Sequence, residues 1–282
     1  MSTTLSPPHS AGAPAAEQRG ATILFEDVAI EFEEKMVLDG VSFRLPRGET
    51  KCLLGIAGAG KTTILKLVLG LIKPDRGRIT VLGQDVSAMP EEELFELRGR
   101  IGMVFQESAL FDSLTVEENV AFRLLEERKL SEEEIHGRVV EALRFVELEH
   151  TLAMAPSELS GGMRRRVAIA RAMVSEPELL LYDSPTGGLD PITSTTIIEL
   201  IVKQRDVYKT SSLLVSHRLQ DGFMMASHYF DTAANEMRPL SQAPRTDVHT
   251  TFLVLREGKV IFDGSSRELA ASHDEYIREY IA

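Results

Sequence analysis

A glycine-rich loop at residues 55–62 constrains this chain more than any other feature. The run Gly55-Ile-Ala-Gly-Ala-Gly60-Lys61-Thr62 fits the pattern G-x-x-x-x-G-K-[ST]. The apolar stretch 51–54 predicts a strand before it, and the pattern at 62–71 predicts a helix after it. Glycines let such a loop curl so that its N–H groups face a phosphate, and the helix N-terminus adds a positive dipole end. We therefore expect a phosphate site in which Lys61 reaches the outer phosphates and Thr62 binds Mg²⁺.

Composition narrows the ligand and partner classes. The 282 residues include 31 Lys plus Arg and 43 Asp plus Glu, which gives a net charge of −12. This balance argues against a nucleic-acid partner, while backbone donors allow an acidic protein to bind polyphosphate. No apolar run approaches the ~18–20 residues of a membrane span, so we expect a chain that does not cross a membrane by itself. Cys52 is the single cysteine, which excludes an internal disulfide.

Two further segments extend the phosphate site. Asp183 follows the apolar strand predicted at 179–182, where a carboxylate can hold Mg²⁺. Ser160, Gly161 and Gly162 precede a predicted helix and form a second candidate anion-binding nest. Two such nests in one chain suggest that two copies sandwich a nucleotide between them.

At this point the chain resembles the nucleotide-binding subunit of an ABC transporter, over roughly residues 22–225 and again at 251–268. Six motifs occur in the family's order: Walker A at 55–63, the Q-loop with Gln106, the signature at 159–163, Walker B at 179–183, the D-loop at 188–190 and the switch histidine, His217. The resemblance implies ATP and Mg²⁺ as cofactors. It implies nucleotide contacts from Phe32, Gly55, Ala57, Gly58, Ala59, Gly60, Lys61, Thr62, Thr63, Ser160, Gly161 and Gly162, metal contacts from Thr62, Gln106 and Asp183, and catalytic positions at Ser184, His217, Gln106 and Asp190.

The same resemblance implies an α/β fold, a P-loop NTPase (RecA-like) core with an N-terminal antiparallel β subdomain and an α-helical signature subdomain. We expect a disordered tail at 1–20 and a cassette at 21–268. Within the cassette we place the helical subdomain at about 90–175 and an insertion at about 226–251, which we interpret as a tolerated loop in preference to a regulatory surface. A C-terminal helix is expected at 269–282.

The stretches 108–120, 156–163 and 188–194 are similar to the ATPases of Mla/Mce-type lipid transporters. That similarity implies a second copy of the chain, a membrane permease, an MCE-type lipid-binding protein and a small regulatory subunit as partners. It also implies a peripheral location at the cytoplasmic face of the bacterial inner membrane. A soluble ABC protein of DNA repair or translation is the rival class, but the long coiled coils or paired cassettes of those proteins are not seen here.

Three positions depart from the family pattern. Ser184 stands where the family normally has a glutamate that acts as general base, so we expect slow hydrolysis, or a hydrolysis-impaired regulatory cassette as an alternative. Glu107, Asp190 or His217 remain open as substitutes for that base. Ala57 replaces a frequent serine, and Arg218 follows the switch histidine where an acid is common.

Two helix-related predictions are local. Thr115-x-x-Glu118 and Ser131-x-x-Glu134 have the spacing of capping boxes that begin helices. Arg164–Arg166 on the signature helix is interpreted as a solvated or phosphate-facing row.

Overall fold

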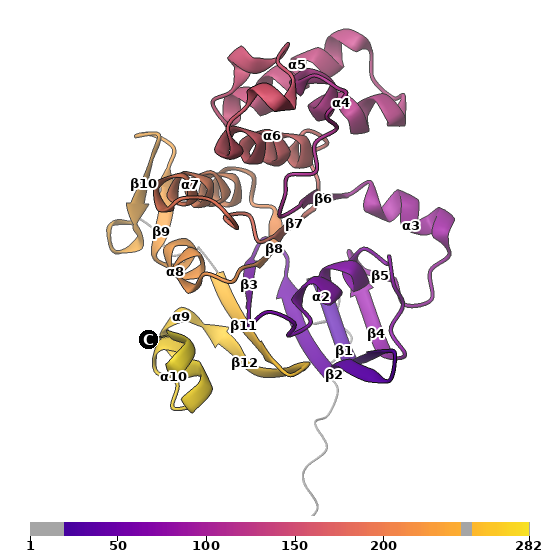
Figure 1. Ribbon diagram of the computed structural model, residues 1–282, viewed down its shortest axis with the longest axis vertical. Coiled ribbons are helices and arrows are strands. Elements are labelled where there is room, and N and C mark those ends of the chain that lie inside the picture. The colour runs from indigo at the N-terminus through magenta and orange to yellow at the C-terminus, as the bar shows by residue number, and fades with distance from the viewer. Residues whose placement is uncertain (1–19, 244–249, 282) are drawn as a thin grey trace, which may run out of the picture.

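The fold combines a mostly parallel sheet, an antiparallel sheet and a lobe of helices (Figure 1). The computed structural model describes residues 20–243 and 250–281. The expected tail lies, except for Gly20, outside the described residues. The helices are α2 (Lys61–Val68), α3 (Glu91–Arg98), α4 (Val116–Glu127), α5 (Glu132–Phe145), α6 (Gly161–Met173), α7 (Pro191–Tyr208), α8 (Leu219–Ser227), α9 (Ser266–Ala270) and α10 (Glu275–Ile281).

The central sheet has the strand order β12-β11-β3-β8-β7-β6. All neighbours in it are parallel except the β11–β12 hairpin, as expected for a RecA-like core. In such a sheet ligands bind beyond the carboxyl ends of the strands, which is where the phosphate loop, Asp183 and His217 follow β3, β7 and β8. The strands are β3 (Thr50–Leu54), β6 (Ile101–Val104), β7 (Leu179–Asp183), β8 (Ser211–Val215), β11 (Thr250–Arg256) and β12 (Lys259–Ser265).

The second sheet has the order β2-β1-β4-β5 and is antiparallel. The strand-like runs 22–25 and 28–32 of the sequence form one long strand. The two runs look separate in the sequence because the strand is irregular between them. Its register with β2 shifts between Phe25 and Val28, and Asp27 has a φ of 49°. The strands are β1 (Ala21–Phe32), β2 (Lys35–Pro46), β4 (Arg76–Val81) and β5 (Gln84–Asp85).

The central sheet is buried on both faces, and alternate side chains belong to different cores. On β7, Leu180 and Tyr182 belong to the core shared with the helical lobe and α7. Leu179 and Leu181 belong to the core shared with α2 and the antiparallel sheet. Successive side chains point to opposite faces, and both faces are buried. The sequence of the strand is therefore a continuous apolar run. Both cores therefore position the end of β7, where Asp183 lies.

The segment 90–175 contains a strand that the mainly helical prediction missed. Four residues, Ile101–Val104, form β6 and pair with β7 at the edge of the sheet. So short a run shows no periodicity that separates a strand from a buried helical turn. The two predicted capping boxes are confirmed at the starts of α4 and α5, where Thr115 and Ser131 each accept from the N–H three residues on.

The expected loop at 226–251 was wrong over the described part. It contains the end of α8, the antiparallel pair β9 (His228–Asp231) and β10 (Glu236–Pro239), and a 3₁₀ turn at Leu240–Gln242; residues 244–249 lie outside the described part. The pair joins through a tight turn in which Asn235 has a φ of 52°.

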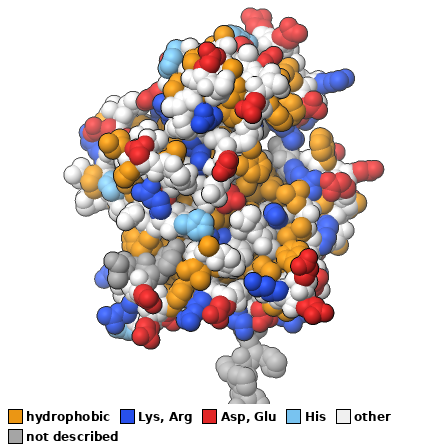
Figure 2. Space-filling model, in the orientation of Figure 1, with side chains coloured by type: hydrophobic (Ala, Val, Ile, Leu, Met, Phe, Trp, Pro, Cys, Tyr) orange, Lys and Arg blue, Asp and Glu red, His pale blue; other side chains and the backbone are white. Residues whose placement is uncertain are grey.

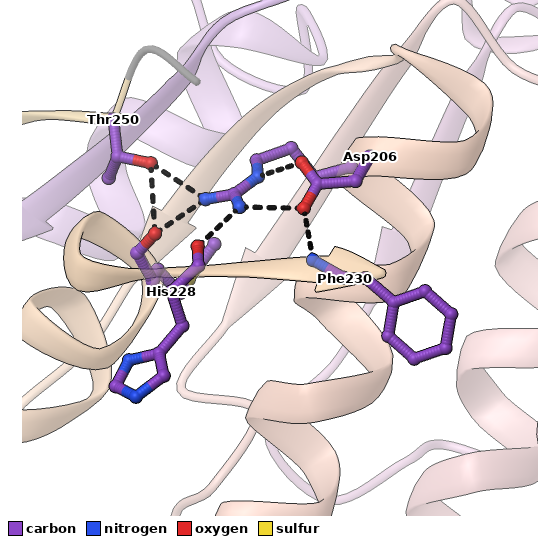
Figure 3. A network of polar contacts seen from close by, with 6 residues as sticks. Asp206, His228, Phe230 and Thr250 are labelled. Atoms are coloured by element: carbon purple, nitrogen blue, oxygen red, sulfur yellow. Dashed lines mark hydrogen bonds and ion pairs between the residues drawn. The ribbon is translucent and has the colours of Figure 1, made fainter. Parts of the chain in front are cut away.

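A buried ion pair on α7 holds both ends of this segment (Figure 3). The Arg205 guanidinium donates to the Asp206 carboxylate, to the carbonyls of Met225 and His228, and to the Thr250 hydroxyl. Asp206 in turn accepts the N–H of Phe230 at 2.8 Å. The insertion is therefore attached to the core by its base.

The C-terminus differs from the single helix expected at 269–282. A capping box at Ser265 begins α9 at residue 266, and α10 begins only at Glu275. Asp274 accepts the Ile277 N–H just before α10, so the two short helices have separate starts.

Candidate functional site

The phosphate loop occupies the turn between β3 and α2. At two of its glycines the neighbouring atoms leave no room for a side chain. Gly60 has a φ of 99°, and a Cβ there would lie 2.6 Å from Leu38 Cδ2. Gly55 has a φ of 149°, and its Cβ would lie 2.6 Å from the carbonyl oxygen of Leu255. Any side chain at either position would collide or force a strained backbone. Ala57 and Gly58 at the tip are exposed, which leaves the loop open to a ligand.

Lys61 closes the loop from inside. Its side chain is buried, and Nζ donates to the carbonyls of Gly55 at 2.7 Å and Ile56 at 2.8 Å. Burial, opposed by the charge of Asp183, lowers the pKa of Lys61 to about 8. The ammonium therefore depends on carbonyl oxygens of its own loop and can exchange them for phosphate oxygens.

Thr62 and Asp183 supply the oxygen donors beside this lysine. Thr62 Oγ1 lies 3.5 Å from Asp183 Oδ2, at the edge of hydrogen-bond distance. Burial raises the pKa of Asp183 above its ordinary value, while Thr62, His217 and Lys61 act in the opposite direction. No group of three or more His, Cys, Asp or Glu side chains suited to a metal occurs in ranges 20–243 and 250–281. One carboxylate and one hydroxyl fit Mg²⁺, which keeps waters and takes further oxygens from a nucleotide.

His217 lies just beyond β8 and is exposed. Burial and then the Lys61 charge lower its pKa below the ordinary value, while Asp183 raises it. The three groups thus act on one another electrostatically, and the structure brings Lys61, Asp183 and His217 to one edge of the sheet.

Ser184 presents no carboxylate to this edge. It is buried, has a φ of 48°, and its hydroxyl has no hydrogen-bond partner among the described residues. Its N–H donates to the Val215 carbonyl at 2.9 Å, so the backbone is tied to β8. A serine hydroxyl is a poor base near neutral pH. The position can therefore orient a water only weakly.

Asp190 and Gln106 have different surroundings. Asp190 caps α7: its carboxylate accepts the N–H groups of Ile192 and Thr193 at 3.0 Å each, and these bonds with the Thr193 hydroxyl hold its pKa below the ordinary value. Gln106 has an exposed side chain, and its backbone carbonyl accepts from Arg165. Asp190 is thus engaged as a helix cap, whereas the Gln106 amide is free to face a ligand.

The remaining predicted nucleotide contacts lie on other elements. Phe32 ends β1 with its side chain 44% exposed, which leaves a ring face available. Ser160 caps α6 and accepts from Met163, so Gly161 and Gly162 lie at a helix N-terminus. A Cβ on Gly162 would lie 2.6 Å from Thr193 Cγ2, which places the signature beside the start of α7.

The expected row at Arg164–Arg166 was wrong for Arg165, which is buried, while Arg164 and Arg166 are half-buried. Each of these arginines donates to backbone carbonyls of its own chain: Arg164 to Leu159 at 2.7 Å, Arg166 to Val146 at 3.1 Å, and Arg165 to carbonyls at the site. Consecutive arginines in a sequence suggest exposed side chains. In the structure, backbone carbonyls of neighbouring segments accept hydrogen bonds from them instead.

Two connections were missed by the sequence reasoning. Arg171 donates to the carbonyls of Ser108 and Ala109, both at 2.7 Å and both residues at positive φ. Arg218, noted only as a charge reversal, donates to the Ser194 hydroxyl at 2.5 Å and lies 3.7 Å from Asp221. Long-range carbonyl and hydroxyl partners leave no local pattern, so nothing in the sequence marks them.

Nucleotide binding should take up protons above pH 8. Among the loop carbonyls Lys61 has a pKa of about 8, and phosphate oxygens favour its charged form, so the bound state holds more protons. Affinity is then flat well below pH 8 and falls by about tenfold from pH 7 to pH 9. Calorimetric titration with ATP at pH 8.5, in two buffers of different ionisation heat, measures the uptake. Equal affinities at pH 7 and pH 9 would contradict it.

Comparison with known proteins gives consistent matches. A family model described as ABC transporter matches residues 38–187. The protein TRIGALACTOSYLDIACYLGLYCEROL 3, chloroplastic, of Arabidopsis thaliana is 39% identical over 263 residues, covering 90% of this chain and 71% of that protein. The intermembrane phospholipid transport system ATP-binding protein MlaF of Escherichia coli K12 is 33% identical over 266 residues, covering 94% and 90%.

Solved structures agree in fold. The cbiO1 structure from Clostridium perfringens, part of the ABC transporter complex cbiONQ, has a TM-score of 0.76 and 28% identity, covering 92% of this chain and 94% of that one. The dimeric structure of the ATP-binding cassette MJ0796 in a post-hydrolysis state, bound to ADP and Pi, has a TM-score of 0.71 and 27% identity, covering 86% and 98%.

Proposed function

Because the chain belongs to the ABC transporter family, as an ATP-binding cassette and an ATPase of that type, we propose that it drives transport of phospholipid or another hydrophobic compound through a separate permease. The observation that carries the ATP part is the convergence of Lys61, Thr62 and Asp183 at the end of the sheet. The lipid part is supported by the relatives whose names describe phospholipid transport. No helix in the described ranges is long and apolar enough to span a membrane.

Each side chain at the nucleotide site has a separate role. Lys61 exchanges two carbonyl oxygens for the outer phosphates, and Thr62 with Asp183 would hold Mg²⁺. When bound, the ion neutralises charge on the phosphate oxygens. Phe32 offers a ring face to the base. His217 and Gln106 face the same site from β8 and the Q-loop, and neither is a carboxylate like the one absent at Ser184.

A single chain does not complete this site. The signature residues Ser160–Gly162 begin α6, on a different lobe from the phosphate loop, and each chain has one copy of each. We therefore propose that two copies pair head to tail and bind ATP between them. Ile192, next to the D-loop, is 82% exposed in the single chain, and pairing would cover it.

An apolar groove offers a docking place for the permease. A cavity of about 430 Å³ lies between β6, α4 and α6, and the exposed rings of Phe105, Phe111 and Phe122 line it. Figure 2 shows hydrophobic side chains on the flank between the helical lobe and α3. The ring centroids of Phe111 and Phe122 lie 4.6 Å apart with the rings tilted by 37°, and this pair makes a preformed surface for an apolar helix of the permease.

Replacing Phe122 by aspartate should abolish permease binding while ATP binding stays within about threefold of wild type, because a charge in the groove removes apolar contact worth about 2 kcal/mol or more. Co-purification of the tagged cassette with a co-expressed membrane permease measures this. Val207→Asp, another exposed apolar position, on α7, is the matched control. Retention of the permease by Phe122→Asp would refute the groove assignment.

The lipid proposal is tested with the cassette and that permease in vesicles. ATP-dependent movement of a fluorescent phospholipid supports it, and movement that needs no ATP or no cassette refutes it. We further propose an MCE-type lipid-binding protein and a small regulatory subunit as partners, and a peripheral position on the cytoplasmic face of a bacterial inner membrane. A second candidate function, a hydrolysis-impaired regulatory cassette, is favoured by Ser184 alone.

A further inference from the structure

Arg165 is a buried cation with an unusual set of partners. Its Nη1 donates to the carbonyls of Ser184 at 3.0 Å and Pro185 at 2.6 Å. Its Nη2 donates to the carbonyl of Gln106 and, at 3.4 Å, to that of Gly187. One side chain from the signature helix thus joins the Q-loop to the segment between Walker B and the D-loop.

No carboxylate within salt-bridge distance offsets this charge in the described part of the chain, since Arg165 has no ion pair there. Burial lowers the pKa of Arg165, and Glu107 is the acid that acts against this. A buried charge needs close polar partners, and here all of them are backbone carbonyls of two site loops. The guanidinium is therefore stable only while both loops keep their present places.

Arg166 provides the internal comparison. It is adjacent on α6 and has the same chemistry, but it donates to Val146, a carbonyl within the helical lobe. Arg165 alone of the two crosses from the lobe to the phosphate-facing loops. Movement of α6 must therefore pull on the backbone at Gln106 and Ser184 through Arg165.

We propose that Arg165 is a positioning residue that couples the placement of the signature helix to the Q-loop and to the backbone after Walker B when two copies close on ATP. This rests on the ATP-driven pairing proposed above. Arg165 does not contact the nucleotide itself. Its loss should leave ATP binding to the phosphate loop intact and weaken closure.

The test compares Arg165→Met and Arg165→Lys with Arg166→Met and Arg166→Lys in the full chain. ATP affinity is measured by calorimetry, and Mg·ATP-dependent pairing by sedimentation. For Arg165→Met we expect ATP affinity within about threefold of wild type and at least a tenfold weaker pairing, with partial rescue by Arg165→Lys, because lysine keeps the charge but lacks the planar fork. Both Arg166 variants should pair as wild type does.

Parallel loss of ATP affinity and pairing in the Arg165 variants, or pairing unchanged in them, would overturn the assignment. If Arg165→Met does not fold, hydrogen exchange in Arg165→Lys decides: faster exchange at both 105–109 and 184–188 supports the coupling, and unchanged exchange refutes it. Failure of the wild type to pair with Mg·ATP would instead refute the head-to-tail dimer, so the two ideas fail separately.

Discussion

Replacing Ser184 by glutamate should raise the rate of ATP hydrolysis by about 100-fold or more. A positioned general base contributes about 10²–10⁴ in rate, and Ser184 supplies none. The position itself is well placed: it follows Asp183 directly, and its N–H is tied to Val215. A carboxylate there would enter a site whose other parts, Lys61 and Thr62, are already assembled. Steady-state phosphate release in the presence of Mg·ATP measures the change.

The matched control is Ser184→Gln, which has the size of glutamate without its charge. It should leave turnover at the wild-type level, so the comparison separates the base from the filling of space around the unpartnered hydroxyl. A wild-type rate ordinary for the family, unchanged by Ser184→Glu, would show that another group orients the water. His217 and Glu107 would then be tested next.

Replacing Lys61 by alanine should weaken ATP binding by about 100-fold or more. The outer phosphates lose their cation, and a hydrogen bond to a charged group contributes about 1.5–3 kcal/mol. The change also leaves the carbonyls of Gly55 and Ile56 without the hydrogen bonds that Lys61 donates to them. Calorimetric titration with ATP measures the affinity, and the thermal midpoint reports whether the fold survives.

Lys66 is the control for charge alone. It lies on the same helix, is exposed, and makes no hydrogen bond to the loop carbonyls within the described ranges. Lys66→Ala should keep ATP affinity within about threefold of wild type. Equal losses in the two variants would mean that net charge near α2 matters, and that the buried ammonium of Lys61 has no special place.

The features predicted well from sequence are those that depend on residues close together in the chain. The strand-loop-helix at 51–71 and the capping boxes at Thr115 and Ser131 depend on contacts between residues close in the chain. The absence of a carboxylate at Ser184 is likewise visible in the sequence. Its burial, its positive φ and its unpartnered hydroxyl required the structure.

The features missed depend on distant partners. Arg165 is one of three consecutive arginines, and only the packing of α6 against two loops tells it from Arg166. Strand β6 is recognisable through its pairing with β7. The pair β9–β10 was hidden because its polar residues read as a loop, whereas its anchoring comes from Arg205 and Asp206 on α7. Tertiary context overrides local propensity in each case.

The clamp formed by Arg205 and Asp206 has a consequence for how the chain tolerates change in length. Arg205 and Asp206 are adjacent on α7 and bind Thr250 and Phe230 respectively. These bonds to the core offset the loss of chain entropy that comes with holding Phe230 and Thr250 close together. Each doubling of a flexible loop inserted between them then adds only about 0.6 kcal/mol of closure entropy. The stretch between those anchors is thus a graft point, where added sequence leaves the chemistry at the far edge of the sheet undisturbed.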